Sequence, residues 1–217
     1  MKELHADSII KSYGSRIVLS DIFIKCSIGE VVGLLGRNGC GKSTMLKIIF
    51  GSLGSEYRFV KVNDIICDKL SANSKFIKYL PQDTLLPKHI KVKTVISLCC
   101  DDYHAEILYE HPLISPFLGK RSRELSGGEL RVLEVLLMLH SSSEYILIDE
   151  PFNGLSPLHV EYIKKAIRSQ TDTKGFIITD HNYSNIMDIS DRIVLMHDGS
   201  LKQIKEESEL KYWGYIP

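Results

Sequence analysis

The sequence has no long hydrophobic run and no recognisable leader. None of its apolar stretches approaches the ~18–20 residues that a helix needs to cross a bilayer. The first residues, 1–7, contain no apolar core of the kind that a signal peptide has. If the protein works at a membrane, we expect another polypeptide to supply the membrane-spanning part.

The chain also lacks a cysteine framework and a net charge. Its five cysteines are odd in number and show no C-x-x-C spacing, which argues against a disulfide set or a zinc site and favours a reducing compartment. Basic and acidic side chains balance at 27 each, so no basic excess points to nucleic acid or to an anionic membrane. A local charged patch remains compatible with that balance. The 217 residues show no repeats or low-complexity tract, and we expect one domain over 1–217.

What the sequence does contain is a complete phosphate-binding loop, G-x-x-x-x-G-K-[ST], at residues 36–43. An apolar run precedes it and a helical pattern follows, which is the strand–loop–helix context that the motif requires. Its glycines let backbone N–H groups turn inward around a phosphate, and the helix dipole adds positive potential. We expect Lys42 to reach the β- and γ-phosphates and Ser43 to bind Mg²⁺. The candidate nucleotide-binding residues here are Gly36, Asn38, Gly39, Cys40, Gly41, Lys42, Ser43 and Thr44.

Two acids follow a buried-type strand predicted over 145–148. Asp149 comes at the carboxyl end of that strand, where open parallel sheets place ligands, and we expect it to hold Mg²⁺. Glu150 follows on the opposite side of the pleat, where it can face a water molecule near the γ-phosphate and accept its proton or orient it. Alone, the pair would fit a solvated strand end equally well; beside a phosphate loop, the catalytic interpretation is favoured.

The segment L-S-G-G-E at residues 125–129 immediately precedes a strongly apolar helical run. Ser126 and Glu129 have the spacing of a capping box, which by itself explains a helix start. The box does not explain Gly127 and Gly128, since two glycines in a first helical turn cost about 1 kcal/mol each relative to alanine. They leave the helix N-terminus bare, so that a phosphate carried by another molecule can approach its N–H groups.

The order of these segments resembles the ATP-binding cassette (ABC) ATPase family: phosphate loop, L-S-G-G-E signature, acidic strand end, and Asp180-His181 after the next strand. The resemblance extends over residues 4–205. It implies an α/β fold of the P-loop NTPase type, with a mixed core sheet, an N-terminal antiparallel β subdomain and a small α-helical subdomain near residues 83–140. It also implies that ATP and Mg²⁺ bind and that ATP is hydrolysed.

The resemblance further implies roles that spacing alone does not. Tyr13 matches the aromatic side chain that stacks on adenine, Gln82 the glutamine that senses Mg²⁺ and the attacking water, and His181 the switch histidine at the γ-phosphate. The signature residues 126–128 would bind ATP held by a second cassette packed head to tail. Arg131 matches a basic residue often seen after the signature, although a helix-surface arginine explains it equally well. The expected catalytic residues are Lys42, Gln82, Glu150 and His181, and the expected metal ligands are Ser43, Gln82 and Asp149.

The leading hypothesis for function is the ATP-hydrolysing subunit of an ABC transporter on the cytoplasmic face of a membrane. It would pair with a second ABC ATPase subunit, identical or different, and drive a separate transmembrane permease; we expect no nucleic-acid partner. One alternative is a non-transport ABC ATPase in regulation, DNA repair or translation, but no heptad insertion or second cassette is present. Another is a nucleotide-gated module without turnover, which the intact Lys42, Asp149, Glu150 and His181 oppose. Ser156, where the family usually has aspartate, is the one departure in its favour.

The remaining pattern predicts the elements around these motifs. Turn residues separate short apolar runs in the N-terminal part, and Asp198-Gly199 marks a hairpin. The C-terminal tail, rich in charge and aromatic residues, is expected to form a short helix on the domain. We expect strands over 8–13, 17–19 and 22–26, strand material over 56–80, and helices over 92–98 and 105–109.

Overall fold

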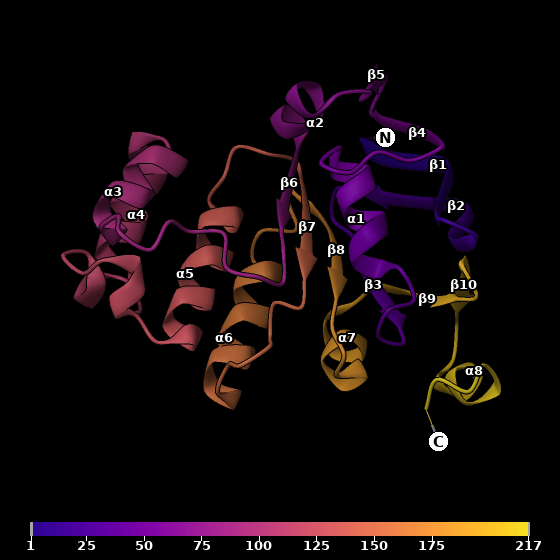
Figure 1. The fold of residues 1–217 in the computed structure, drawn as a ribbon. Helices are drawn as coiled ribbons and strands as arrows, with labels where there is room; N and C mark the ends of the chain where they lie inside the picture. Colours follow the sequence, from indigo (N-terminus) through magenta and orange to yellow (C-terminus); the bar gives the residue numbers. More distant parts are fainter. Residues whose placement is uncertain (1, 217) are drawn as a thin grey trace.

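A six-stranded mixed sheet forms the centre of the structure, a computed structural model that describes residues 2–216 (Figure 1). Its spatial order is β10-β9-β3-β8-β7-β6, and every neighbouring pair is parallel except the hairpin of β9 and β10. Strands β3, β7 and β8 are buried over their whole length, as expected for parallel strands covered on both faces. The bounds are β3 (Val31–Gly36), β6 (Ile77–Leu80), β7 (Tyr145–Asp149), β8 (Gly175–Thr179), β9 (Arg192–His197) and β10 (Ser200–Ile204).

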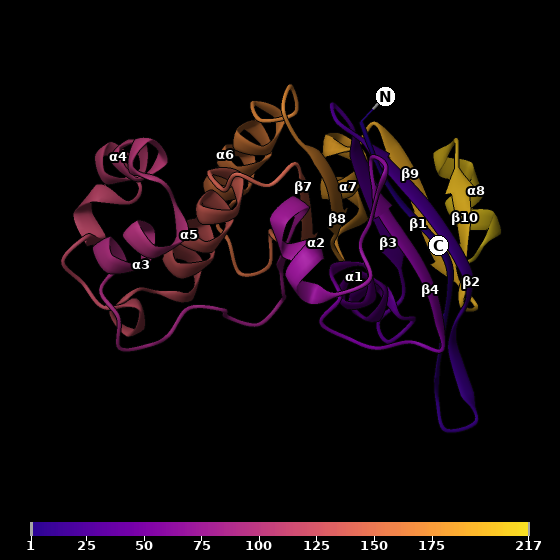
Figure 2. The same ribbon diagram turned by 90° about the horizontal axis from the view of Figure 1, so that it is seen from above.

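A four-stranded antiparallel sheet from the N-terminal part lies against this core, in the order β2-β1-β4-β5 (Figure 2). Its two longest strands differ from the three short ones predicted, because Ser8 and Asp21 have positive φ and interrupt the alternation without ending the strands. The predicted class, α/β with a mixed core sheet and an N-terminal antiparallel sheet, is confirmed. The bounds are β1 (Glu3–Tyr13), β2 (Arg16–Ser27), β4 (Tyr57–Val62) and β5 (Ile65–Ile66).

Successive side chains of the core strands enter two separate hydrophobic clusters. Leu147 packs with Met45 of α1 and with the antiparallel sheet on one face. Ile146 and Ile148 point to the other face and pack with α5, α6 and α7, for example with Leu133. Within residues 2–216, none of the helices has both the length and the apolar character that crossing a bilayer takes. The helices are α1 (Lys42–Phe50), α2 (Leu70–Phe76), α3 (Val92–Cys99), α4 (Asp102–Glu110), α5 (Gly127–Leu139), α6 (Pro157–Arg168), α7 (Tyr183–Ile189) and α8 (Glu207–Tyr212).

Helix α2 corrects the prediction of strand material over 56–80. The segment does contain strands β4, β5 and β6, but residues 70–76 between them are helical. A long-range contact holds this helix, because the fully buried Asn73 donates a hydrogen bond from Nδ2 to the carbonyl of Ile49 at 2.9 Å. Asn73 thereby satisfies a carbonyl in the last turn of α1, a partner that no local pattern around residue 73 encodes.

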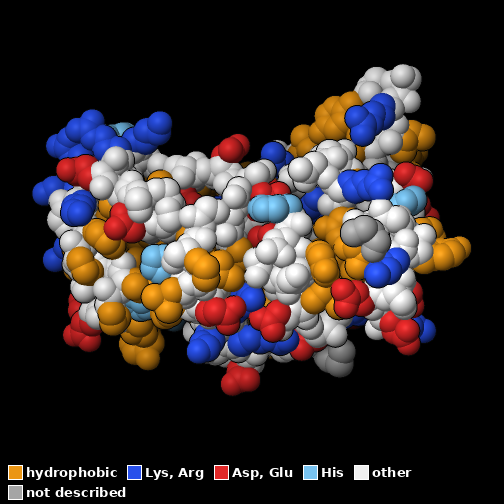
Figure 3. Space-filling model, turned by 90° about the horizontal axis from the view of Figure 1, so that it is seen from below, with side chains coloured by type: hydrophobic (Ala, Val, Ile, Leu, Met, Phe, Trp, Pro, Cys, Tyr) orange, Lys and Arg blue, Asp and Glu red, His pale blue; other side chains and the backbone are white. Residues whose placement is uncertain are grey.

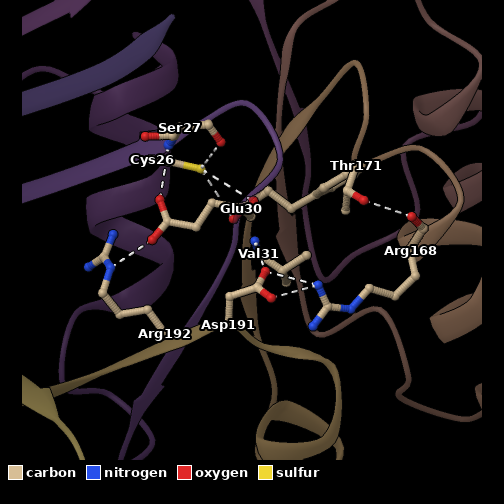
Figure 4. Close-up of polar contacts among 9 residues, drawn as sticks. Cys26, Ser27, Glu30, Val31, Arg168, Thr171, Asp191 and Arg192 are labelled. Carbon is tan, nitrogen blue, oxygen red and sulfur yellow. Dashed lines mark hydrogen bonds and ion pairs between the residues drawn. The ribbon is translucent and has the colours of Figure 1, made fainter. Parts of the chain in front are cut away.

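An ionic network ties together the edge of the sheet opposite the carboxyl ends of β7 and β8 (Figure 4). Asp191 accepts a 2.8 Å hydrogen bond from the backbone N–H of Val31 and pairs with Arg168 at 2.9 Å. Glu30 accepts from Arg192 Nε at 2.7 Å and from the backbone N–H of Ser27 at 3.0 Å. The network joins the β2–β3 turn, the start of β9 and the end of α6, and so fixes the strand that leads into the phosphate loop.

Basic side chains gather at one edge of the helical lobe, although the whole chain is neutral. Segments 88–93 and 118–123 lie side by side, with the Val92 N–H donating to the Lys120 carbonyl at 2.9 Å. Figure 3 looks onto the side toward which β7 and β8 point and shows Lys and Arg clustered over this lobe. The net charge of zero therefore does not reveal this basic patch, which lies just before the signature helix. Its exposed members are Lys88, Lys91, Lys93, Lys120, Arg121 and Arg123.

Candidate nucleotide-binding site

Ten of the residues predicted from the sequence to bind nucleotide or act in catalysis line one cavity of about 640 Å³ at the carboxyl ends of the core strands. That volume falls within the range typical of small-molecule sites. Residues from five separated parts of the chain meet here: the β1–β2 hairpin, the phosphate loop, the segment after β6, the end of β7 and the end of β8. The predicted residues that line the cavity are Tyr13, Asn38, Gly39, Gly41, Lys42, Ser43, Thr44, Gln82, Glu150 and His181.

The phosphate loop presents an open helix N-terminus to this cavity. Helix α1 begins at Lys42, and its N-cap Gly41 has φ 115 and offers no side-chain cap, so the N–H groups of the first turn stay available for an anion. A side chain at position 41 would be strained by that φ and would also meet Val18 and Leu19 at 3.0 Å. Gly39, with φ 74, has the same backbone requirement. These features make a cradle of the right size and polarity for the phosphates of ATP.

Lys42 is 6% exposed, and its ammonium is turned toward the loop itself. Nζ donates to the carbonyl of Gly36 at 2.6 Å and lies 3.3 Å from the carbonyl of Arg37. Gly36 is the last residue of β3 and does not line the cavity. Cys40 lines a neighbouring hollow instead. The loop thus holds its one buried cation beside the phosphate cradle.

Asp149 lies behind the cavity wall, only 2% exposed at the end of β7. Its Oδ1 accepts a 2.6 Å hydrogen bond from the Thr179 hydroxyl, and its Oδ2 lies 3.3 Å from the Tyr79 hydroxyl. Burial raises the pKa of Tyr79, and the charge of Asp149 raises it further, so the phenol remains a donor to the carboxylate. The carboxylate is therefore held in one orientation at the strand end.

Glu150 is placed by a backbone feature that strand alternation did not predict. It has φ 53, a left-handed conformation that is uncommon outside glycine, and its N–H donates to Thr179 Oγ1 at 3.1 Å. The turn brings its carboxylate to the cavity, where Gln82 Nε2 donates to Oε2 at 2.8 Å. Nδ1 of His181 lies 3.7 Å from the same oxygen. Oε2 of Glu150 thus lies between the Gln82 amide and the His181 imidazole. All three residues were predicted from the sequence, and the fold brings them together.

Tyr13 lies at the outer rim of the cavity, at the tip of the β1–β2 hairpin. Its side chain is 52% exposed, so its ring is accessible for stacking with a planar ligand. Lys11 Nζ lies 5.2 Å from its ring centroid. A half-exposed aromatic ring that lines the same cavity as the phosphate loop can stack on a nucleoside base.

The signature lies outside this cavity. The Ser126 hydroxyl caps α5 by accepting from the Glu129 N–H at 3.3 Å, and the Ser126 N–H donates to Glu129 Oε2 at 2.7 Å, which confirms the capping box. These bonds lower the pKa of the Glu129 carboxyl. A Cβ added to Gly127 would meet nothing within 4 Å. Gly127 and Gly128 line a separate hollow, so the structure does not bring the signature to the nucleotide cavity of its own chain.

Arg131 is buried, which rules out the helix-surface interpretation. Its guanidinium donates to the carbonyls of Pro81 at 2.7 Å and Glu150 at 3.1 Å, and pairs with Glu134 at 3.4 Å. Glu134 in turn accepts from the Leu85 N–H at 2.7 Å. Arg131 therefore connects the signature helix to both Gln82's segment and the strand end that carries Glu150.

The oxygen donors of the site fit Mg²⁺. Ser43 and Gln82 line the cavity, and Asp149 stands behind them with a buried carboxylate, a set of hard oxygen ligands. No group of three or more His, Cys, Asp or Glu within residues 2–216 could hold a metal alone. Mg²⁺ is usually held by one or two protein oxygens together with phosphates and water.

Three cavity residues were not predicted from the sequence: Arg16, Val18 and Asn153. Arg16 reaches the carbonyl of Gly39 at 3.4 Å across the hairpin. None belongs to a motif, and only the folding of β2 over the phosphate loop places the first two there. Ser156, the departure from the family pattern, caps α6 by accepting from the His159 N–H at 3.3 Å.

Comparison with other proteins supports the resemblance to ABC ATPases found in the sequence. The family model described as ABC transporter matches residues 19–153. The chain is 30% identical over 211 residues to the lipopolysaccharide export system ATP-binding protein LptB of Acidithiobacillus ferridurans, covering 91% of this chain and 88% of that protein. It is 31% identical over 215 residues to LptB of Escherichia coli (strain K12), covering 93% and 89%.

Solved structures agree in fold. An ATP-binding subunit of an ABC transporter superposes with a TM-score of 0.86 at 21% identity, covering 97% of this chain and 93% of that one. A nucleotide-free ATP-binding cassette gives 0.84 at 21% identity, covering 100% and 96%. The chain belongs to the ABC transporter family, as one of its ATP-binding subunits that hydrolyse ATP to power transport.

Proposed function

We propose that hydrolysis takes place in the cavity described above, with Glu150 as the group that orients and deprotonates the attacking water. The observation that carries this proposal is the position of the Glu150 carboxylate, 2.8 Å from Gln82 Nε2 and 3.7 Å from His181 Nδ1 at the wall of the phosphate cavity. A base must lie within hydrogen-bond reach of the proton that it removes. Gln82 fixes the carboxylate, and His181 adds a donor that faces the same reacting centre.

Binding of ATP is assigned to the remaining lining residues. Tyr13 stacks on the base, and the N–H groups of residues 39–44 surround the phosphates. Lys42 exchanges its contacts with the loop carbonyls for the β- and γ-phosphates. Ser43, Gln82 and Asp149 supply the oxygens for Mg²⁺, which when bound neutralises phosphate charge. We further propose that residues 1–217 act as one ATPase domain, with the helices between 83 and 140 as its smaller lobe.

The signature acts on the ATP of another subunit. Ser126, Gly127 and Gly128 lie outside their own chain's cavity, while their helix end is free of neighbouring side chains at Gly127. Each chain carries both halves of a complete site, so two copies packed head to tail have two sites. ATP then forms part of the interface, and hydrolysis lets the pair separate.

The pair works on a separate transmembrane permease at the cytoplasmic face of a membrane. Support comes from the relatives, which are ATP-binding proteins of an export system and match over nearly their whole length. In this arrangement the closing and opening of the two cassettes are the movement that the permease uses.

Complementation between two inactive variants tests the proposal. Lys42→Ala disables the phosphate loop and leaves the signature intact; Gly127→Asp adds a carboxylate where the phosphate must approach, in open space that leaves the fold unchanged. Each variant alone should be inactive. A 1:1 mixture should regain about a quarter of the wild-type ATPase rate, because about half of random dimers are mixed and each has one intact site. No recovery in the mixture would refute action of the signature on another chain.

A further inference from the structure

The β1–β2 hairpin closes with Tyr13 and Arg16 opposite each other. They are the last paired residues of the two strands, and the turn between them consists of Gly14, with φ 59, and Ser15. Side chains of directly opposed residues leave a sheet on the same face, with their Cβ atoms about 4.5–5.5 Å apart. Both side chains also line the nucleotide cavity. A base that stacks on Tyr13 therefore has Arg16 beside it.

Arg16 extends from the hairpin to the phosphate loop. Its Nη2 donates to the carbonyl of Gly39 at 3.4 Å, which is a long hydrogen bond. The same side chain lines the neighbouring hollow that contains Asn38 and Cys40. The guanidinium thus lies between Tyr13 at the rim and the N–H groups of the loop. In a nucleotide, the part between the base and the β-phosphate is the ribose with the α-phosphate.

The guanidinium of Arg16 has no counter-charge of its own. The residue is exposed, and within residues 2–216 it forms no ion pair. The acids that line the same two hollows have other partners. Glu150 accepts from Gln82 at 2.8 Å. Asp198 lies 3.3 Å from His197 Nδ1. Because a guanidinium carries five N–H donors in a planar fork that matches two phosphate oxygens, Arg16 offers most of its donors to an anion in the cavity.

We propose that Arg16 binds the α-phosphate of the nucleotide whose base stacks on Tyr13, so that the closing pair of the hairpin holds the nucleoside end of ATP. The proposal rests on the function proposed above, which assigns the base to Tyr13 and the β- and γ-phosphates to Lys42. On binding, the guanidinium exchanges its long bond to Gly39 for charge-assisted bonds to the phosphate, which are shorter and roughly twice as strong.

The α-phosphate lies away from the bond that hydrolysis breaks, which joins the γ-phosphorus to its bridging oxygen. A contact with it is therefore equal in the ground state and in the transition state. Uniform binding of this kind lowers KM and leaves kcat unchanged. ADP carries the same α-phosphate as ATP, so the contact must contribute equally to the binding of both. This pattern distinguishes Arg16 from Glu150, which acts at the reacting end.

The test compares Arg16→Met, which removes the charge and the donors at similar length, with Arg121→Met. Arg121 is a matched control because it is exposed in the basic patch and lines neither hollow. Arg16→Met should raise the Kd of ADP and the KM of MgATP by the same factor, about tenfold, with kcat within about twofold of wild type. Arg16→Lys should give an intermediate value, since it keeps the charge and loses the fork. A loss for ATP alone, or a fall in kcat at constant KM, would refute the assignment.

A thiophosphate probe tests the contact at the α-phosphate itself. ADPαS carries sulfur in place of one α-oxygen, and sulfur is a weak acceptor. One diastereomer of ADPαS should bind the wild-type protein less tightly than ADP does. This difference should shrink in Arg16→Met and persist in Arg121→Met, whereas the effect of ADPβS should be equal in all three proteins. If Arg16 only ties the hairpin to the loop, Arg16→Met weakens every nucleotide alike and leaves the α-thio effect unchanged, which would refute the proposal.

Lys42→Ala separates this proposal from the function on which it rests. If Lys42→Ala weakens ATP binding while Arg16→Met binds ADP as the wild type does, only the role of Arg16 is refuted. If Lys42→Ala binds ATP as tightly as the wild type, the assignment of the site is refuted, and the role of Arg16 with it.

Discussion

Replacing Arg131 by methionine should destabilise the protein more than most single substitutions. Methionine has a similar length and removes only the charge and the donors. The side chain of Glu134, 2% exposed, would then lose the one cation with which it forms an ion pair within residues 2–216. The carbonyls of Pro81 and Glu150 would each lose a donor. Breaking a buried pair in this way typically costs about 3–5 kcal/mol, because one charge is left without compensation in a medium of low polarity.

The size of this effect is measurable against the whole stability of the domain. At about 2–4 °C per kcal/mol for a domain of this length, Arg131→Met should lower the unfolding temperature by about 6–20 °C. The double variant Arg131→Met/Glu134→Gln keeps an acceptor for the Leu85 N–H and removes the stranded charge. It should therefore be more stable than Arg131→Met alone, with a coupling free energy of several kcal/mol in the double-mutant cycle.

Urea unfolding, followed by far-UV circular dichroism, measures the free energy of unfolding of the wild type, both single variants and the double variant. The four values give the coupling free energy between Arg131 and Glu134. The double variant should have lower ATPase activity than the wild type even if its stability is partly restored, because no side chain then bridges the carbonyls of Pro81 and Glu150. A cost below about 1 kcal/mol for Arg131→Met, or strictly additive effects in the cycle, would refute the reasoning from burial.

Three further outcomes follow from the site and its surroundings. Glu150→Gln should lower ATP turnover at least about 100-fold and leave nucleotide binding unchanged; wild-type turnover would overturn its assigned role. A thiol-alkylating reagent should inhibit the ATPase through Cys40, with protection by MgATP and resistance in Cys40→Ala, since burial raises the pKa of each of the other four thiols. Burial, helped by the charges of His104, His111 and Lys174, lowers the pKa of His140 to about 4. The folded state therefore binds this proton less readily than the unfolded chain, so its contribution to stability is complete above about pH 6.5 and is lost as the pH falls toward about 4. His140→Gln should flatten the dependence of unfolding free energy on pH in that window, and an unchanged slope would contradict the assignment.

The nucleotide site could be predicted in large part from the sequence because its chemistry is carried by short contiguous motifs. The phosphate loop needs glycine at positions with positive φ, and the structure places Gly39 and Gly41 in that conformation. The capping box at Ser126 and the hairpin at Asp198-Gly199 are equally local and were predicted correctly. Each depends on backbone preferences that a few neighbouring residues decide.

Features that depend on distant partners were not predictable in the same way. Helix α2 depends on Asn73 reaching Ile49, and Arg16 reaches the cavity only because β2 folds over the loop. The burial of Arg131 depends on carbonyls 50 and 19 positions away. The contact between Arg37 and Gly214 spans 177 positions, and neither residue has a local pattern that indicates it.

The most direct test of the central claim, that ATP is held between the phosphate loop of one chain and the signature of another, is the mass of Glu150→Gln in solution with saturating MgATP. Analytical ultracentrifugation should show the single chain without nucleotide and twice that mass with it. The double variant Glu150→Gln/Gly127→Asp should remain a single chain under the same conditions. A Glu150→Gln protein that binds MgATP and still sediments as a single chain would contradict the claim.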